Sequence, residues 1–186
     1  MSTRRLFVAI PIEHAVMLQK CFEKCRHEFR HHRVHWLHPS MWHVTLWFMG
    51  NVDVVDNLCD DMQQIAMAFS PFEVNVEGLG WFSSRGHRRI VWAGVAPSDA
   101  LSCLQKAVAS KIGHEAPFVP HITLGRTGRN EASSWPHAWW LSNEQRHFDR
   151  IRIDGFALYE SILSSEGSTY RRIADFKFGS TVISLK

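Results

Sequence analysis

The chain has 186 residues, of which 45% are apolar and 21% are charged, and its formal net charge is +3 at pH 7. This length suits one domain or two small fused lobes, and the apolar share is enough for a sizeable core. The composition excludes a disordered chain, and Leu6 to Ile12, the longest apolar stretch near the N-terminus, is too short to span a bilayer. The mild positive charge permits an anionic partner without identifying one.

The sequence has neither the pattern of a secretory signal nor that of a disulfide-rich protein. The opening Met-Ser-Thr-Arg-Arg is not followed by the apolar region of a secretory signal. The cysteines lack the density and spacing of a disulfide framework; they are Cys21, Cys25, Cys59 and Cys103. We therefore expect a reduced, cytoplasmic protein without membrane attachment.

The first quarter of the chain predicts a strand, a helix and two more strands. Residues 5–10 form an apolar strand, and residues 14–29 carry apolar side chains three and four positions apart, as one face of a helix does. A short strand near residues 34–37 is predicted to turn at residues 38–40. It would return as a second strand over residues 43–49.

The middle of the chain predicts helices on either side of a hairpin. Asp53 is placed to cap a helix whose apolar face is Val55, Leu58, Met62, Ile65 and Phe69. Residues 72–82 and 89–95 alternate as two strands of a hairpin, and a helix follows over residues 101–112. Gly113 is predicted to end that helix.

The last third begins with a strand at His121 and ends with two strands over residues 151–161 and 168–178. Between them, residues 127–150 show little periodicity. Helices neither alternate strictly with strands nor are absent. We therefore predict an α+β fold with a mostly antiparallel sheet.

Two tetrapeptides in different halves of the chain share one pattern. They read His43-Val-Thr-Leu and His121-Ile-Thr-Leu, and each lies in a predicted strand after a proline-containing turn. Side chains alternate between the two faces of a strand, so His43 and Thr45 share a face, as do His121 and Thr123. If the two strands lie side by side near a pseudo-twofold axis, one cleft contains both histidines and both threonines.

This set of side chains suits the hydrolysis of a phosphodiester without a metal. Imidazoles with a pKa near 6.5 can take a proton from water and give one to a leaving oxygen at neutral pH. Threonine hydroxyls on the same face can hydrogen-bond the phosphate oxygens. Arg126 would add a bidentate contact. In an undistorted strand Arg126 points away from His121, so it reaches the site only if the chain bends at Gly125.

These motifs resemble those of the two-histidine (2H) phosphoesterase superfamily, and the match is closest to its bacterial RNA 2′,3′-cyclic phosphodiesterases, historically called 2′-5′ RNA ligases. The resemblance covers nearly the whole chain. Its segments are Arg5-Leu-Phe-Val-Ala-Ile-Pro, His43-Val-Thr-Leu-Trp-Phe-Met-Gly50, Pro117-Phe-Val-Pro-His-Ile-Thr-Leu-Gly-Arg126, and Leu158-Tyr-Glu-Ser161 with Gly167 and Tyr170. The departures are Met49 for a usual leucine and the Trp-rich segment after Arg126.

The resemblance implies a bilobal α+β fold over residues 1–186, a single domain of two interleaved lobes. Two mostly antiparallel sheets would be related by a pseudo-twofold, with helices outside and a central cleft. It implies hydrolysis of the 2′,3′-cyclic phosphate end of RNA or an oligonucleotide to a 2′-phosphomonoester, with no metal and no cofactor. The short apolar stretch near the N-terminus predicts no membrane partner. We expect the protein to be a monomer.

The resemblance also implies the role of each site residue. His43 would protonate the departing 3′ oxygen and His121 would activate water, while Thr45, Thr123 and Arg126 would hold the phosphate. The motifs are nearly symmetric, so the acid and base roles can be exchanged.

Two other functions remain open from the sequence. One is a 2′-5′ RNA ligase whose physiological direction is joining, and water favours hydrolysis unless the acceptor hydroxyl is held in place. The other is a non-catalytic module that binds a nucleotide or RNA end, although binding alone needs no acid–base pair. Product formation separates them.

Several further features have a structural and a functional interpretation. We interpret Trp47, on the face of His43 by strict alternation, as a core residue, the alternative being a base-stacking surface. The tryptophans of the segment 127–150 would pack over the second lobe, or form a lid or RNA platform; they are Trp135, Trp139 and Trp140.

Histidines and arginines form two more clusters. The histidine cluster near Cys21 and Cys25 matches no structural zinc pattern, and we expect no metal there; its members are His31, His32, His35 and His38. The basic tip of the predicted hairpin is a solvated turn or a phosphate contact; its members are Arg85, His87, Arg88 and Arg89.

Overall fold

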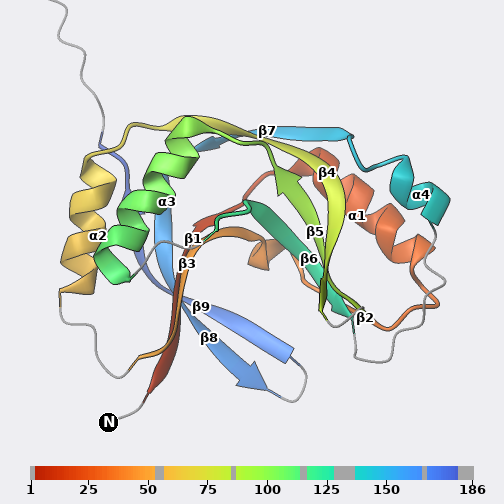
Figure 1. The fold of residues 1–186 in the computed structure, drawn as a ribbon, viewed down its shortest axis with the longest axis horizontal. Coiled ribbons are helices and arrows are strands. Elements are labelled where there is room, and N and C mark those ends of the chain that lie inside the picture. Colours follow the sequence, from red (N-terminus) through yellow and green to blue (C-terminus); the bar gives the residue numbers. More distant parts are fainter. Residues whose placement is uncertain are drawn as a thin grey trace, which may run out of the picture.

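The computed structural model describes residues 3–52, 57–84, 87–113, 117–127, 137–164 and 167–179. Within these ranges nine strands form one sheet (Figure 1). The strands are β1 (Arg4–Pro11), β2 (Val34–Trp36), β3 (His43–Val52), β4 (Phe72–Ser84), β5 (His87–Val95), β6 (His121–Thr127), β7 (His147–Ile153), β8 (Gly155–Ser164) and β9 (Gly167–Lys177). The helices are α1 (Val16–Glu28), α2 (Leu58–Met67), α3 (Asp99–Ile112) and α4 (His137–Leu141), with a 3₁₀ turn, η1, at Pro39–Met41.

The sheet is antiparallel and consists of two halves that meet at one residue pair. Its strand order is β7-β4-β5-β6-β3-β1-β8-β9, and β2 pairs with β6. In the described parts of the chain, the two central strands, β3 and β6, pair only through Val44 and Ile122. The predicted α+β class with antiparallel strands is therefore confirmed, and the two expected sheets are joined at this single pair.

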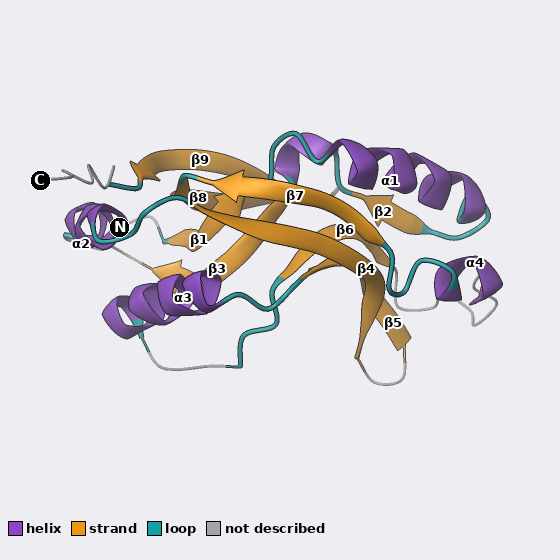
Figure 2. Cartoon of the chain, turned by 90° about the horizontal axis from the view of Figure 1, so that it is seen from above, coloured by secondary structure: helices purple, strands orange, loops and turns teal. Residues whose placement is uncertain are grey.

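The helices cover the two halves separately. α2 and α3 pack on each other and contact β9 and β3, whereas α1 contacts β7 (Figures 1 and 2). α1 follows β1 in sequence but covers the half to which β1 does not belong. No helix in the described ranges combines the length and apolar composition needed to cross a bilayer.

The first helix shows how these layers are connected. Its apolar positions Leu18, Cys21 and Cys25 are buried, as the spacing predicted. Its N-cap residue makes no side-chain capping bond, and the carboxylate of Asp149 on β7 accepts hydrogen bonds from the amides of Met17 at 3.1 Å and Leu18 at 2.8 Å. A negative charge at this end also complements the helix dipole. The sheet therefore supplies the cap that the helix lacks.

Two predictions about the strands were wrong. β2 does not form a hairpin with β3 across residues 38–40; it pairs with β6, because η1 turns the chain away. The expected strand over residues 151–161 is two strands that break at Asp154, and α4 and the start of β7 lie within 127–150, where no structure was expected. Asp53, the expected helix cap, lies outside the described residues.

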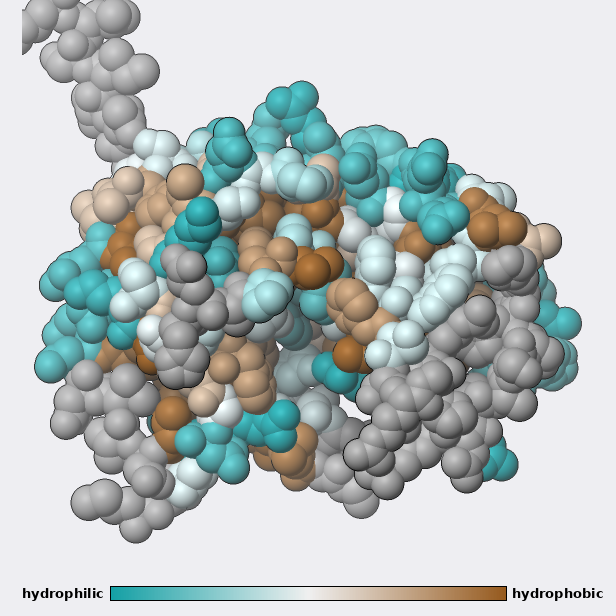
Figure 3. Space-filling model, viewed as in Figure 1, coloured by the Kyte–Doolittle hydropathy of each residue, from teal (hydrophilic) through white to brown (hydrophobic). Residues whose placement is uncertain are grey.

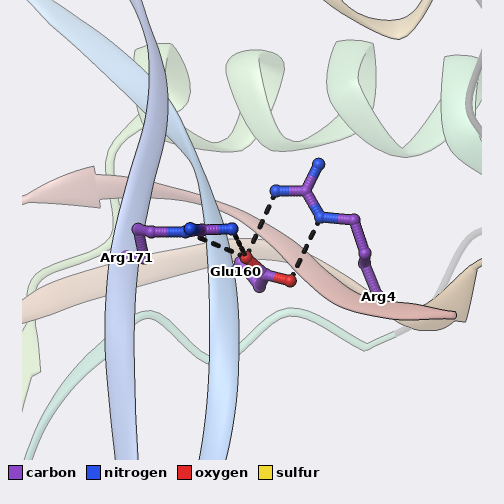
Figure 4. A network of polar contacts seen from close by, with 3 residues as sticks. All are labelled: Arg4, Glu160 and Arg171. Carbon is purple, nitrogen blue, oxygen red and sulfur yellow. Dashed lines mark hydrogen bonds and ion pairs between the residues drawn. The ribbon is translucent and has the colours of Figure 1, made fainter. Parts of the chain in front are cut away.

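An ion-pair network connects the last hairpin to the first strand. Glu160 on β8 accepts hydrogen bonds from Arg4 on β1, at 3.1 and 3.2 Å, and from Arg171 on β9 (Figure 4). These charge-assisted contacts hold the pKa of the Glu160 carboxyl below its usual value. Three neighbouring strands are thus joined by side chains as well as by their backbone ladders.

Candidate active site

The pair that joins the two halves also positions both motifs. Val44 and Ile122 lie directly opposite each other and are buried, with 1% and 0% of their surface exposed. Paired residues point to the same face of a sheet, so their neighbours in both strands point to the other face. His43, Thr45, His121 and Thr123 therefore share one face, and all four are partly exposed.

The register around this pair is nearly symmetric. In an antiparallel ladder centred on it, His43 lies opposite Thr123 and Thr45 lies opposite His121, so the histidines are diagonal neighbours. Such neighbours lie about 7–8 Å apart in a regular ladder. Among the described residues, β3 and β6 have no second residue pair. In the view of Figure 3 the molecular surface is hollowed near the middle.

Each imidazole is oriented by a backbone carbonyl two residues earlier in the chain. Nδ1 of His43 lies 2.8 Å from the carbonyl oxygen of Met41, and Nδ1 of His121 lies 2.7 Å from that of Val119. A carbonyl oxygen can only accept, so Nδ1 carries the hydrogen in both rings. Nε2 is then the nitrogen left to exchange a proton with a substrate.

The environment favours the neutral form of both imidazoles. The pKa of His43 is lowered to about 4, mainly by burial and also by the charges of His121 and Arg126, against the raising effect of the Met41 carbonyl. Burial and Arg126 also lower the pKa of His121. These influences show that His43, His121 and Arg126 lie close to one another. An anion between them would oppose the shift and raise both pKa values.

A bulge in β6 turns Arg126 onto the histidine face. Thr123 and Gly125 pair with consecutive residues of β5, so Leu124 is an extra residue. Leu124 and Gly125 are both buried, and Arg126, the next residue, is exposed. The bend at Gly125 that Arg126 requires is therefore present. Within the described chain, Arg126 has no ion-pair partner, and neither threonine hydroxyl has a hydrogen-bond partner.

A second bulge corrects the prediction for Trp47. Thr45 and Trp47 pair with consecutive residues of β1, so Leu46 is the extra residue in β3. Trp47 then faces the core, where its ring lies close to Gly113 at the end of α3. Its core interpretation is confirmed, but its expected place on the His43 face was wrong. Phe48 takes that place and is 47% exposed.

Aromatic rings line both sides of the site, and the sequence analysis did not identify them. The His43 ring lies 5.1 Å, centre to centre, from Phe7 and from Tyr170, and 6.1 Å from Tyr159. On the other side, His121 lies 4.8 Å from Phe82. Phe7 alternates with the core residues of β1, a signal that was available in the sequence; the other contacts depend on strand pairing.

Two tryptophans of the segment 127–150 have structural roles. Trp140 is 2% exposed and packs on Trp81 at 5.1 Å, while Trp139 packs on Phe29 at 6.2 Å, which confirms the packing interpretation for these two tryptophans. The described residues contain no group of three or more His, Cys, Asp or Glu side chains arranged to hold a metal ion. Trp135, Arg85 and the side chains of residues 87–89 lie outside the description.

Comparisons of this chain with a family model and with individual proteins point to the same family. A model of the 2′-5′ RNA ligase superfamily matches residues 15–162. The protein named RNA 2′,3′-cyclic phosphodiesterase in Thermotoga maritima is 29% identical over 185 residues, which span 94% of this chain and 95% of that protein. Its namesake in Methanothermobacter thermautotrophicus is 32% identical over 157 residues, 78% of this chain and 83% of that one.

Solved structures share the fold. TT0787 of Thermus thermophilus superposes with a TM-score of 0.74 at 25% identity, over 94% of this chain and 97% of that one. Apo LigT of E. coli gives a TM-score of 0.70 at 22% identity, over 97% of this chain and 100% of that one. The arrangement of strands is thus common to these proteins.

Proposed function

Because the chain belongs to the 2′-5′ RNA ligase superfamily, we propose that it is an RNA 2′,3′-cyclic phosphodiesterase that uses His43 and His121 as an acid–base pair and needs no metal. The relatives that carry this enzyme name align with most of the chain. The observation that carries the proposal is the pairing of Val44 with Ile122, which directs both histidines and both threonines to one face. The substrate would be the 2′,3′-cyclic phosphate end of an RNA or oligonucleotide.

The proposed reaction is a single displacement at phosphorus. Nε2 of His121 takes a proton from water as the water oxygen bonds to phosphorus. The bond from phosphorus to the 3′ oxygen breaks, and Nε2 of His43 gives that oxygen its proton. The product is a 2′-phosphomonoester with a free 3′ hydroxyl. Each proton transfer is typically worth about 10² to 10⁴ in rate.

The lowered pKa values set a condition on this mechanism. The acid must be protonated at neutral pH, yet burial lowers the pKa of His43 to about 4 in the free protein. The phosphate anion must therefore stabilise the imidazolium when it binds. The near-symmetric motifs also allow the reverse assignment, with His121 as the acid. Either assignment uses both rings.

Thr45, Thr123 and Arg126 are proposed to hold the phosphate. The hydroxyls lie on the histidine face with no partner among the described residues, and Arg126 is brought to that face by its bulge. A guanidinium stabilises negative charge on non-bridging oxygens throughout the displacement. We also propose that the enzyme acts as a cytoplasmic monomer with a single domain, because one chain contributes all five groups.

The product of the reaction distinguishes this function from its alternatives. RNA ending in a 2′,3′-cyclic phosphate is incubated with the protein in excess EDTA, and the products are compared chromatographically with 2′- and 3′-phosphate standards. We expect the 2′-phosphate alone, at the rate seen without EDTA. Binding without any product would indicate a binding module, and a 2′-5′-joined product would indicate a ligase. Loss of activity in EDTA would contradict the metal-free mechanism.

A further inference from the structure

The two motif strands contain the same bulge, but the residues that it exposes differ. In each strand the last residue of the motif is an extra residue, Leu46 in β3 and Leu124 in β6, and β3 has a second extra residue at Met49. The second residue after it is Phe48 in one strand and Arg126 in the other, and both are exposed. Because the strands are antiparallel, these residues lie at opposite ends of the site. One end therefore presents a cation and the other an aromatic ring.

The aromatic end has a cation of its own. Arg5 lies on β1, two residues from Phe7, so both side chains point to the same face of the sheet. On that face the ring of Phe7 contacts the ring of His43. Its guanidinium carbon lies 4.9 Å from the centre of the Phe48 ring, and Phe7 stacks on the same ring at 6.3 Å. Arg5 and Phe48 thus form one contiguous surface with the wall of the active site.

Arg5 differs from its neighbour in what it binds. Arg4 points to the opposite face and forms two hydrogen bonds with Glu160. Arg5 has no carboxylate partner among the described residues, and its Nε atom is buried without a hydrogen-bond partner. A buried polar atom of this kind is costly unless something satisfies it. Arg5 as a whole is only partly buried, so a ligand phosphate beside Phe48 can reach its guanidinium.

We propose that Phe48 and Arg5 form a subsite for the nucleotide that precedes the reacting one, with its base on the Phe48 ring and the internucleotide phosphate on the Arg5 guanidinium. The inference rests on the proposed function and makes its substrate an oligonucleotide end rather than a free nucleoside cyclic phosphate. The subsite is indifferent to sequence, because every base has a face that stacks on an aromatic ring.

The spacing along β1 fits such a strand. Ala9 lies beside Thr45, at the reacting phosphate, and Phe7 lies beside Phe48. These two positions are one step apart on the same face, roughly 6.6 Å for strand geometry. That step is comparable with the distance between successive phosphates of a nucleic-acid strand. Arg126 would thus contact the reacting phosphate. Arg5 lies one further step along β1, and its guanidinium, 4.9 Å from the centre of the Phe48 ring, would contact the phosphate that precedes it.

The test compares two substrates that share the reacting group. One is adenosine 2′,3′-cyclic phosphate, and the other is the dinucleotide ApA with a 2′,3′-cyclic phosphate end. The readout is the ratio of kcat/KM for the dinucleotide to that for the nucleoside. We expect the wild-type ratio to exceed 10, since a hydrogen bond to a charged group is worth about one order of magnitude or more.

Three variants show which residues cause the preference for the dinucleotide. Arg5→Gln and Phe48→Leu should each lower the ratio about 10-fold, because they remove the phosphate contact and the stacking surface. Arg4→Gln is the matched control, as it removes an adjacent charge on the other face, and it should leave the ratio unchanged. Arg5→Gln should also reduce the slope of log kcat/KM against log salt for the dinucleotide by about 0.7, the value for one phosphate contact on a single strand.

The following results on active enzyme would contradict the proposed subsite. A wild-type ratio near 1 would show that no preceding nucleotide is bound. Equal losses on both substrates in Arg5→Gln and Phe48→Leu would assign these residues a structural role, as would an equal effect of Arg4→Gln. If the wild type hydrolyses neither substrate, the proposed function fails instead. The subsite is then tested alone by comparing the affinities of ApA 2′-phosphate and adenosine 2′-phosphate, and equal affinities would reject it.

Discussion

His43 shows most directly how burial and function are coupled in this site. Its ring is packed among Phe7, Tyr159 and Tyr170, while its Nδ1 hydrogen is held by the Met41 carbonyl. This packing fixes the direction of Nε2 but disfavours the imidazolium, which is why the pKa falls to about 4. The orientation that the chemistry needs therefore comes with a penalty for protonation.

That penalty predicts how stability depends on pH. The unfolded state binds a proton at His43 near pH 6.5, whereas the folded state binds it only near pH 4. Between these values protonation favours the unfolded state, so the free energy of unfolding decreases as the pH falls. Lowering the pH from 7 to 5 reduces the free energy of unfolding by about 2 kcal/mol through the protonation of His43 alone. His43→Gln should remove it, so denaturant unfolding of this variant at the two pH values should show a correspondingly smaller loss than the wild type.

An equal loss of unfolding free energy in the wild type and in His43→Gln would contradict the burial of this imidazole.

The motif pattern alone predicted that His43 and Thr45 share a face, because period-two alternation requires it. The rings around His43 were not predictable in the same way. Tyr159 and Tyr170 reach it from β8 and β9, and no local sequence pattern specifies which strands become neighbours.

At the scale of the strands, bulges decide which residues enter the site. Strict alternation places Trp47 beside the histidines and Arg126 away from them, and the extra residues Leu46 and Leu124 reverse both. β7 contains a similar irregularity, since Val76 and Glu77 of β4 pair with Asp149 and His147. This broke the alternation that would have revealed β7. Bulges form through pairing with another strand, which a single segment does not show.

The bulge in β6 depends on the absence of a side chain at Gly125. A Cβ atom there would lie 2.8 Å from the ring of Trp36 and 2.9 Å from a methyl of Val34, both on β2. Gly125→Ala should therefore displace β6 from β2 and move Arg126 out of position. A lost charge-assisted contact corresponds to a roughly 10- to 100-fold lower kcat/KM, to be measured on RNA with a cyclic phosphate end.

Arg126→Gln provides the comparison for this variant. It removes the guanidinium without altering the bulge and should lower kcat/KM to a similar extent, while its melting temperature stays near that of the wild type. Gly125→Ala should lose stability as well as activity. Wild-type activity in a folded Gly125→Ala protein would show that the bulge does not position Arg126.

At the scale of the whole molecule, the site depends on a narrow junction. Each half of the sheet contributes one histidine and one threonine, and Val44 with Ile122 is the only pair between the central strands that the described residues form. The sequence predicted an α+β fold with a cleft between halves, and the family comparison and the strand order agree. The path of β2 and the segment from α4 to β7 were not predicted, because both depend on contacts with distant strands.

The junction can be weakened without touching a site residue. Ile122→Ala removes buried methyl groups at the contact and should lower the free energy of unfolding by about 2–5 kcal/mol. We expect kcat/KM to fall by more than the unfolded fraction explains, because the two imidazoles lose their common register. Ile122→Val keeps the branched shape, should cost about 0.5–1.5 kcal/mol, and should retain near-wild-type activity. If the two variants, both folded, hydrolyse RNA equally well, the junction does not set the geometry of the site.

The central claim is that His43 and His121 act together on one phosphate. Single-turnover hydrolysis of RNA with a 2′,3′-cyclic phosphate end, in EDTA, compares the wild type with His43→Ala, His121→Ala and the double variant. Each single substitution should reduce the rate at least about 10²-fold, and the double variant should be much less impaired than the product of the two effects, because the pair works as a unit. A wild-type rate in either single variant would contradict the two-histidine mechanism.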